Sequence, residues 1–420
     1  MNKQVAENRA DRSPAYIASP FAMLMMLTCA LVLSQAFRTV ATILALPLKA
    51  QFDLSAQALG LFSGTYHFTF GALQFFMGMS IDVYGVRRTV LSAFPFAIAG
   101  ALLSALAPRL EWLVFGQMLI GIGCAPAFLV CTVFVARHFP PTRFAALSGL
   151  VLGLGSAGMI ITGTPLAWLV EHYSWRAGFA ALGIAAILVW LLIWWRVHEP
   201  ARAAAGDTPS MRDALRSYGP LFKLPHTAGI LLLGFVGYAS FISLRGLWLG
   251  PMLNIRHGLS LVECGNVALV MSLINIVSPP LFGRLDPGTV PRRRWIVACS
   301  LTVATLFALM AFDPGAAMGA KAGAVIDATL CVAIGLFAGY SVLQYANVRS
   351  AYPAAITGRA IGLFNMSMFL GAAFMQWFTG LTASIAQAHG VEIFSVVFAT
   401  IAILLALGSL SFAWLPKPPG

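Results

Sequence analysis

Charged residues are scarce in this sequence. Only 10% of its 420 residues are Asp, Glu, Lys or Arg, whereas an ordinary soluble domain carries about a quarter. Because a water-exposed surface needs charged groups, this scarcity excludes a soluble globular protein. Hydrophobic residues make up 59% of the chain, which is typical of a protein whose solvent is lipid.

Strands of alternating polarity are missing as well. A membrane β-barrel would show segments of about ten residues in which apolar and polar side chains alternate. The chain instead contains long apolar runs without Asp, Glu, Lys or Arg, among them 112–136, 177–195, 328–348 and 393–416. Each approaches or exceeds the roughly 20 residues that a spanning helix needs. Since only helices and closed barrels satisfy the backbone in lipid, the sequence predicts an all-α integral membrane protein.

Clusters that carry metal, redox or catalytic chemistry are also lacking. All six cysteines lie inside apolar runs, without a C-x-x-C pair or a histidine at metal-ligand spacing, so we interpret them as small buried residues. An enzyme should show clustered His, Asp or Glu at one membrane boundary, or a nucleophile motif. The sequence has neither of these, nor a nucleotide-binding loop. We therefore expect no enzyme activity, no cofactor and no metal.

Breaks at charged and Pro- or Gly-rich positions divide the chain into twelve apolar spans. They cover 20–46, 56–80, 89–108, 112–136, 144–169, 177–197, 226–251, 263–283, 295–312, 323–348, 359–386 and 392–415. The first span resembles the core of a signal peptide. However, the segment before it has mixed charge, and its apolar run continues to Leu48. We interpret it as a retained first helix.

The basic residues set the predicted orientation. With a cytoplasmic N-terminus, 19 of the 26 Lys and Arg residues face the cytoplasm, five face the other side, and Arg38 and Arg245 lie within the membrane. This asymmetry is what the positive-inside rule requires, and it predicts that both termini are cytoplasmic in a multi-pass protein of a bacterial inner membrane. Facing anionic lipid, these loops account for the net charge of +12 without a nucleic-acid partner.

The longest polar stretch, 198–224, separates six spans from six. Leu54, Ser55, Gly60 and Gly78 recur 205 residues later, and Pro140, Gly149, Leu150 and Gly158 recur 213 residues later. We therefore predict an N-tail at 1–19, a six-helix bundle at 20–197, a cytoplasmic linker at 198–224, a second bundle at 225–415 and a C-tail at 416–420. Repeats of this kind place a transport site between the halves near the bilayer midplane.

A specific motif lies between the second and third spans. It reads Gly78-Met-Ser-Ile-Asp82-Val-Tyr-Gly85-Val-Arg87-Arg88 and closely resembles the G-x-x-x-D-x-x-G-x-R-[RK] signature of the major facilitator superfamily. Gly283-Arg-Leu-Asp286 followed by Arg292-Arg293-Arg294 is a weaker copy in the second half, and Trp175-Arg176-Ala-Gly-Phe179 resembles the superfamily's W-R-x-x-F. The resemblance covers about residues 20 to 415. It implies two pseudo-symmetric six-helix bundles, a secondary transporter and a rocker-switch mechanism.

The motif also predicts a gate at the cytoplasmic face. Gly78 and Gly85 permit a tight turn and close helix contact, and Asp82 can accept hydrogen bonds from a helix N-terminus and pair with Arg137. The alternative is a solvated turn whose basic residues only set topology. We assign to the gate Gly78, Asp82, Gly85, Arg87, Arg88, Arg137 and Asp286.

Arg38 and Arg245 are the charged residues that lie clearly within the spans, and ionisable groups in such positions are functional candidates. They belong to spans one and seven, which are equivalent in the two halves and line the central cavity in the superfamily. Two arginines across that cavity would bind a carboxylate or phosphate through forked hydrogen bonds. This loosely resembles the organophosphate antiporters. Alternatively, either arginine reaches the lipid headgroups or bonds the free carbonyls of a broken helix.

Polar residues at middle depth complete the predicted pocket or bond helix to helix. They are Gln35, Tyr66, Gln74, Gln117, Trp248, Asn275, Gln344, Tyr345, Asn347, Asn365 and Gln376. Gln117 stands where the superfamily often has an arginine. The candidates for proton coupling are His67, which has a suitable unperturbed pKa, together with Glu263 and Asp327. Anion exchange would need none of them.

Spans one and four lack the Asp or Glu that many proton-coupled drug exporters use. The sequence therefore favours transport of a small organic anion, by proton symport or anion exchange, in a monomer surrounded by lipid. The alternatives are export of a neutral or hydrophobic compound and a transport-like membrane sensor. A sensor should have an additional soluble domain, for which the 27-residue linker is too short.

Overall fold

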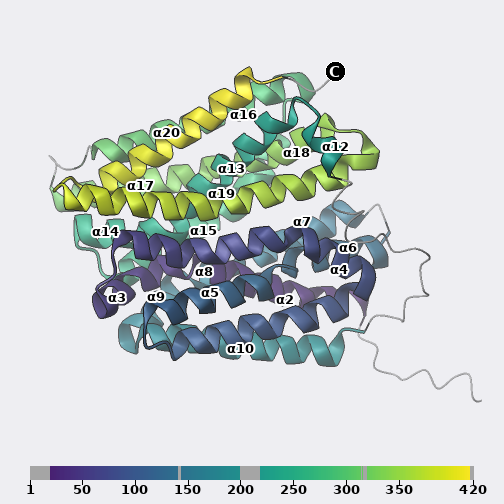
Figure 1. Ribbon diagram of the computed structural model, residues 1–420, viewed down its shortest axis with the longest axis horizontal. Helices are drawn as coiled ribbons and strands as arrows, with labels where there is room; N and C mark the ends of the chain where they lie inside the picture. Colours follow the sequence, from purple (N-terminus) through teal and green to yellow (C-terminus); the bar gives the residue numbers. More distant parts are fainter. Residues whose placement is uncertain (1–18, 141–142, 199–217, 314, 316–318, 417–420) are drawn as a thin grey trace, which may run out of the picture.

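The computed structural model describes residues 19–140, 143–198, 218–313, 315 and 319–416. Within these ranges the chain is helical and has no strand (Figure 1), which confirms the predicted all-α class. Eleven helical segments are long and apolar enough to cross a membrane. The tails and most of the predicted linker fall outside the described ranges, so their bounds and the orientation of the termini stay predictions.

The helices follow the predicted spans closely. In the first half they are α2 (Pro20–Thr39), α3 (Ala41–Phe52), α4 (Ala56–Ala105), α5 (Leu110–Cys124), α6 (Ala127–His138), α7 (Phe144–Gly155), α8 (Ala157–Ile161), α9 (Thr164–His172) and α10 (Trp175–Arg196). In the second half they are α12 (Gly219–Phe222), α13 (Thr227–Ser243), the π-helical turn η2 (Leu244–Trp248), α14 (Leu249–His257), α15 (Leu261–Arg284), α16 (Thr289–Phe312), α17 (Ala320–Phe337), the 3₁₀ turn η4 (Ala338–Tyr340), α18 (Ser341–Ala351), α19 (Ala354–Ala388) and α20 (Ile393–Trp414).

The long helix α4 provides two crossings. Its 50 residues would extend for about 75 Å at the α-helical rise, far more than the roughly 30 Å of a bilayer core. Gly85 interrupts it with a φ of 84°, a conformation that glycine adopts without strain. The first arm, 56–81, contains His67 and Gln74 and is less apolar than the eleven other spans. With it, the described chain has the predicted twelve crossings.

Several spans are broken in mid-membrane. Span one changes from α2 to α3 at Val40, span five is divided into α7, α8 and α9, and span seven passes through η2. Helix breaks leave backbone carbonyls without their usual partners, which is tolerated at membrane depth only where protein or a cavity satisfies them. These breaks lie where the two halves meet, since α2 and α3 contact η2 and α8 contacts α15.

Figure 1 shows the helices of the first half gathered in one layer and those of the second half in another. We call the end that carries Arg196 and Gly219 the linker end, and the end that carries Phe52 and His257 the far end. In the predicted orientation the linker end is cytoplasmic. The element pair α3 and α14 lies at one side of the view, whereas α6 and α12 lie at the other.

The two halves are in close contact at the far end. A methyl group on Gly250 of α14 would lie 2.1 Å from the Thr42 carbonyl oxygen of α3, and one on Gly60 of α4 would lie 2.4 Å from the Gln376 carbonyl oxygen of α19. Such distances leave no room for a side chain, so only glycine permits this approach. The far end is therefore closed in this conformation.

Candidate functional site

A cavity of about 580 Å³ lies between the halves. The first half contributes residues of α2, α7 and α8, and the second contributes residues of α13, α15, η4 and α18. The lining extends from Arg38, in the middle of span one, to Gly149 and Gly283 close to the linker ends of their helices. Because the far end is closed, the cavity extends toward the linker end only.

Arg38 is the charged residue in this lining. Its side chain extends from α2 toward the second half, and its Nη1 donates a hydrogen bond to the Tyr238 hydroxyl at 3.0 Å. The guanidinium lies over the rings of Phe70, at 5.0 Å, and Phe369, at 4.7 Å. Aromatic faces attract a cation by cation–π interaction. Arg38 thus joins both halves at the closed end of the cavity.

The charge of Arg38 has no ionic partner in the described part of the chain. Its side chain is 7% exposed, and its Nε has no hydrogen-bond partner. An uncompensated charge removed from water is costly, and the ring faces and one hydroxyl offset only part of that cost. A ligand with an anionic group would provide the missing acceptors.

Arg245 occupies a different environment. It lies in η2, is fully buried, and does not line the cavity. Its Nη2 donates to the Met159 carbonyl oxygen at 2.7 Å and to Ser272 Oγ at 3.1 Å. Met159 belongs to α8, within the broken span five. Arg245 therefore has the contacts of the alternative that the sequence left open, binding to carbonyls of a broken helix.

Three of the predicted polar residues line the cavity with Arg38. Gln35 Oε1 has no hydrogen-bond partner, and Asn275 Nδ2 lies 3.9 Å from Met159 Sδ. Tyr345 donates a hydrogen bond to Asn365 Oδ1. The cavity thus presents amide and hydroxyl groups beside one guanidinium.

The other predicted pocket residues are outside this lining. The Tyr66 hydroxyl bonds Ser34, and Trp248 Nε1 donates to Thr379 Oγ1 at 2.9 Å. Gln117 and Gln344 are buried, and the Gln117 Nε2 and both amide atoms of Gln344 have no hydrogen-bond partner. In this conformation Tyr66 and Trp248 hydrogen-bond neighbouring helices, and Gln117 and Gln344 are packed between helices around the cavity.

The cavity lining also contains three polar residues that were not predicted from the sequence, namely Tyr238, Tyr340 and Ser341. Tyr340 accepts a hydrogen bond from Ser300 Oγ at 2.6 Å. Tyr238 carries a recognisable signal, because it lies seven residues before Arg245 and therefore two helical turns away on a similar face. The other two lie at η4, a helix break that the apolar pattern does not reveal.

The proton-coupling candidates lie apart from one another. His67 is fully buried in α4, where its Nδ1 contacts the Ser63 carbonyl oxygen at 3.2 Å and its Nε2 has no partner. Asp327 lies at the far end of α17, where its Oδ2 accepts from Arg256 at 3.1 Å and contacts His257 Nε2 at 2.8 Å. Neither partner of Asp327 was predicted from the sequence.

The predicted gate is described only in part. The Asp82 side chain lies outside the described residues, so its pairing with Arg137 stays a prediction. Arg87 Nη2 donates to the Trp194 carbonyl oxygen at 2.8 Å, and Arg88 is exposed. A methyl group on Gly78 would meet Leu129 at an ordinary 3.8 Å.

The second copy of the motif contains an ion pair. Arg292 Nη2 lies 2.7 Å from Asp286 Oδ2, and Arg292 Nε also donates to this carboxylate. These hydrogen bonds hold the pKa of Asp286 below its ordinary value. Asp286 therefore stays ionised at the linker end and fixes the turn between α15 and α16.

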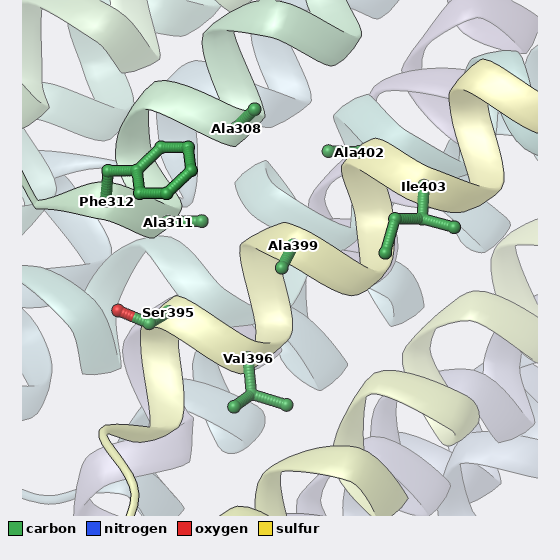
Figure 2. Close-up of a pocket in the computed structure, with 8 residues that line it drawn as sticks. All are labelled: Ala308, Ala311, Phe312, Ser395, Val396, Ala399, Ala402 and Ile403. Atoms are coloured by element: carbon green, nitrogen blue, oxygen red, sulfur yellow. The ribbon is translucent and has the colours of Figure 1, made fainter.

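A second hollow lies on the outer face of the second half, between α16 and α20 (Figure 2). Its lining consists of Ala308, Ala311, Phe312, Ser395, Val396, Ala399, Ala402 and Ile403. Ser395 supplies the one side-chain oxygen that Figure 2 draws there. With almost no polar group, this groove can accept an apolar chain but cannot orient a charged solute.

Known proteins are similar to this chain in sequence or in fold. The D-galactonate transporter of Escherichia coli O6:H1 is 24% identical over 397 residues, which cover 87% of this chain and 88% of that protein. The hexuronate transporter of Bacillus subtilis is 25% identical over 193 residues, which cover 45% of each chain. The crystal structure of a D-xylose–proton symporter matches 96% of this chain and 99% of its own with a TM-score of 0.74 at 16% identity.

The family profile described as Major Facilitator Superfamily matches residues 26–376. It thus includes both the glycine motif between spans two and three and the cavity with Arg38. Taken with the twelve crossings in two layers, this match makes the chain a multi-pass membrane protein of the Major Facilitator Superfamily of transporters.

Proposed function

We propose that this protein is a secondary transporter of a small organic anion, and that the carboxylate of the solute binds Arg38. The observation that carries the proposal is the guanidinium at the cavity wall without an ionic partner in the described chain. A carboxylate there would form charge-assisted hydrogen bonds, which are about twice as strong as neutral ones. The planar fork of arginine suits two carboxylate oxygens.

The neighbouring groups suit a solute with several hydroxyls. Gln35 offers an unsatisfied carbonyl oxygen, and Tyr238, Asn275 and Tyr345 contribute hydroxyl and amide groups to the same wall. A hydroxylated carboxylate could therefore bind its acid at Arg38 and its hydroxyls along α13 and α15. The relatives named for D-galactonate and hexuronate support this class of solute.

The solute would cross by alternating access. With the far end closed, the solute enters and leaves the cavity from the linker end. Transport then requires the glycine contacts at Gly60 and Gly250 to separate while the linker ends of the bundles approach each other. Arg38 takes part in both steps, because its hydrogen bond to Tyr238 and its cation–π contact with Phe369 join the two halves.

Uptake into proteoliposomes tests the proposal. Radiolabelled D-galactonate and a hexuronate would be offered to the wild-type protein, to Arg38→Ala, and to Arg109→Ala, an exposed arginine outside the cavity, as matched control. We expect uptake by the wild type and the control and loss of uptake with Arg38→Ala. Full uptake by Arg38→Ala would overturn anion binding at Arg38 and favour the neutral-solute alternative.

A further inference from the structure

A second group of charged side chains lies away from the cavity, at the far end of the second half. Arg256, the penultimate residue of α14, is at its centre. Its guanidinium contacts Asp327 at 3.1 Å, Glu392 at 3.0 Å and Asp313 at 3.5 Å. These carboxylates belong to α17, to the N-cap of α20 and to the C-cap of α16. Arg256 thus ties the end of α14 to three other helices.

His257 adds a group that can take up a proton. Its Nε2 lies 2.8 Å from Asp327 Oδ2, the same oxygen that accepts from Arg256. The side chain of Asp327 is 1% exposed and that of His257 is 4% exposed. Asp327 Oδ1 and Asp313 Oδ1 are buried without a hydrogen-bond partner. The carboxylates therefore have acceptor capacity that the present contacts do not use.

The charge balance of this group favours a proton. Three carboxylates surround one guanidinium, so the set carries a net charge of −2 when His257 is neutral and Asp313, Asp327 and Glu392 are ionised. A neutral His257 donates its Nε2–H to Asp327, which leaves Nδ1 as the basic nitrogen. A proton taken from solution onto Nδ1 would give an imidazolium beside a carboxylate and reduce the net charge to −1.

The Nδ1 edge of the His257 ring, which would take up the proton, faces Gly323. A methyl group on Gly323 of α17 would lie 3.3 Å from His257 Nδ1, so the missing side chain leaves this nitrogen less covered. Glu263 of α15 is tied to the Ser260 amide, and Cys331 lies one turn beyond Asp327 on α17. In the described part of the chain, no group of three or more His, Cys, Asp or Glu could hold a metal.

The same short helix forms the closed far end. Gly250, near the start of α14, packs on the Thr42 carbonyl of α3, and Thr42 also donates to the Arg245 carbonyl. The nine residues of α14 thus carry the contact with the first half at one end and the charged group at the other. A change in charge at His257 would act on the far-end closure through this rigid element.

From this geometry we infer that His257 and Asp327 form a proton-binding site whose occupation holds the far end closed. The imidazolium pairs with Asp327, strengthens the tie between α14 and α17, and keeps Gly250 against Thr42. Loss of the proton restores the excess negative charge, loosens α14 and favours opening at the far end. This device regulates the alternating access proposed above and rests on that function, but it does not depend on which solute is carried.

Hydrogen–deuterium exchange without any solute tests the site. The full chain in nanodiscs of phosphatidylethanolamine and phosphatidylglycerol would be labelled at pH 5.5 and 7.5, with labelling times scaled for intrinsic exchange. We expect peptides that cover α3 and α14 to be about threefold less protected at pH 7.5, because losing a proton that favours the closed conformation shifts the equilibrium toward opening. Equal protection of these peptides at both pH values in the wild type would by itself overturn the inference.

Two variants locate the effect. His257→Gln keeps a hydrogen-bond donor but cannot take up a proton, so its α3 and α14 peptides should lose their pH dependence. His389→Gln, an exposed histidine at the end of α19, should behave like the wild type. A pH dependence that survives in His257→Gln would overturn the inference. Because no solute is present, failure of anion uptake by the wild type would count against the proposed function and leave this test unchanged.

Discussion

Arg245 donates a hydrogen bond to the Met159 carbonyl oxygen at 2.7 Å and thereby joins the two halves through a fully buried charge. The carbonyl lacks its usual backbone donor because span five is broken around α8, where the Gly163 amide donates to the Ile160 carbonyl instead. A superfamily transporter must break and remake contacts between its halves in each cycle. This hydrogen bond is therefore a candidate for one that forms only while the far end is closed.

Replacing Arg245 by Ala should destabilise this conformation. The change removes the charged donor of the Met159 carbonyl, which keeps the hydroxyls of Ser272 and Thr162 as partners. A hydrogen bond to a charged group contributes about 1.5–3 kcal/mol. We expect a lower thermal unfolding temperature in detergent and weaker exchange protection of α14. Arg245→Lys should be intermediate, because a lysine keeps the charge but not the fork of donors. An unchanged melting temperature and unchanged protection would show that the bond contributes nothing.

Tyr238→Phe should weaken binding of the anion without abolishing it. The hydroxyl holds Arg38 Nη1 at 3.0 Å, and a hydrogen bond to a charged group contributes about 1.5–3 kcal/mol. We expect the dissociation constant for D-galactonate, measured by scintillation proximity, to rise by about tenfold or more. Tyr173→Phe, at an exposed tyrosine of the far end, should bind as the wild type does. Equal affinity in both variants would argue against a role for Tyr238 in positioning Arg38.

Gly250→Ala should prevent the far end from closing. The added methyl group would lie 2.1 Å from the Thr42 carbonyl oxygen, well inside van der Waals contact, and the backbone on both sides would have to move. We expect transport to stop and the exchange protection of α3 to fall. Gly358→Ala is the matched control, since a methyl group there meets nothing within 4 Å. Normal transport by Gly250→Ala would mean that α3 and α14 separate without loss of function.

The Asp286–Arg292 pair predicts a pH-dependent contribution to stability. Because Arg292 lowers the pKa of Asp286 in the folded state, the pair stabilises the fold above the unfolded pKa of about 4. This stabilisation is lost as the pH falls through the folded pKa. Asp286→Asn should therefore lower stability at pH 7, by about 1 kcal/mol or less for a partly exposed pair, and the difference should shrink in acid.

Thermal unfolding of wild type and Asp286→Asn at several pH values measures this difference. Glu171→Gln, at an exposed position of the far end, controls for the general effect of removing a negative charge. A difference that stays constant from pH 7 into acid would contradict a stabilising ion pair at Asp286.

The membrane spans could be predicted because their signals are local patterns of residues along the chain. Long uncharged runs predicted the crossings, and the charged motif beginning at Gly78 predicted the family that the comparisons confirm. Depth in the membrane follows from distance along the helix, so Arg38 and Arg245 were recognisable as buried charges. These features are local, and lipid imposes them on each helix separately.

The direction in which each side chain points could not be predicted, because it depends on helix irregularities that the hydrophobic pattern does not show. The π-helical turn η2 contains Arg245 itself and shifts the helical phase at that point. Arg245 meets the Met159 carbonyl from this turn, whereas Arg38, on an α-helical segment, lines the cavity. The charged group around Arg256 also escaped prediction, because its members are separated by up to 136 residues in sequence.

Composition and residue spacing are enough to predict a helical chain that crosses the membrane about twelve times in two related halves, with two arginines inside the spans. They do not reveal that Arg38 borders the cavity, that Arg245 binds a carbonyl of the opposite half, or that His257 meets Asp327; the packing of the helices does. This difference arises because hydrophobicity acts on each helix separately. Breaks in the helices and close glycine contacts fix the rotation and partners of each side chain.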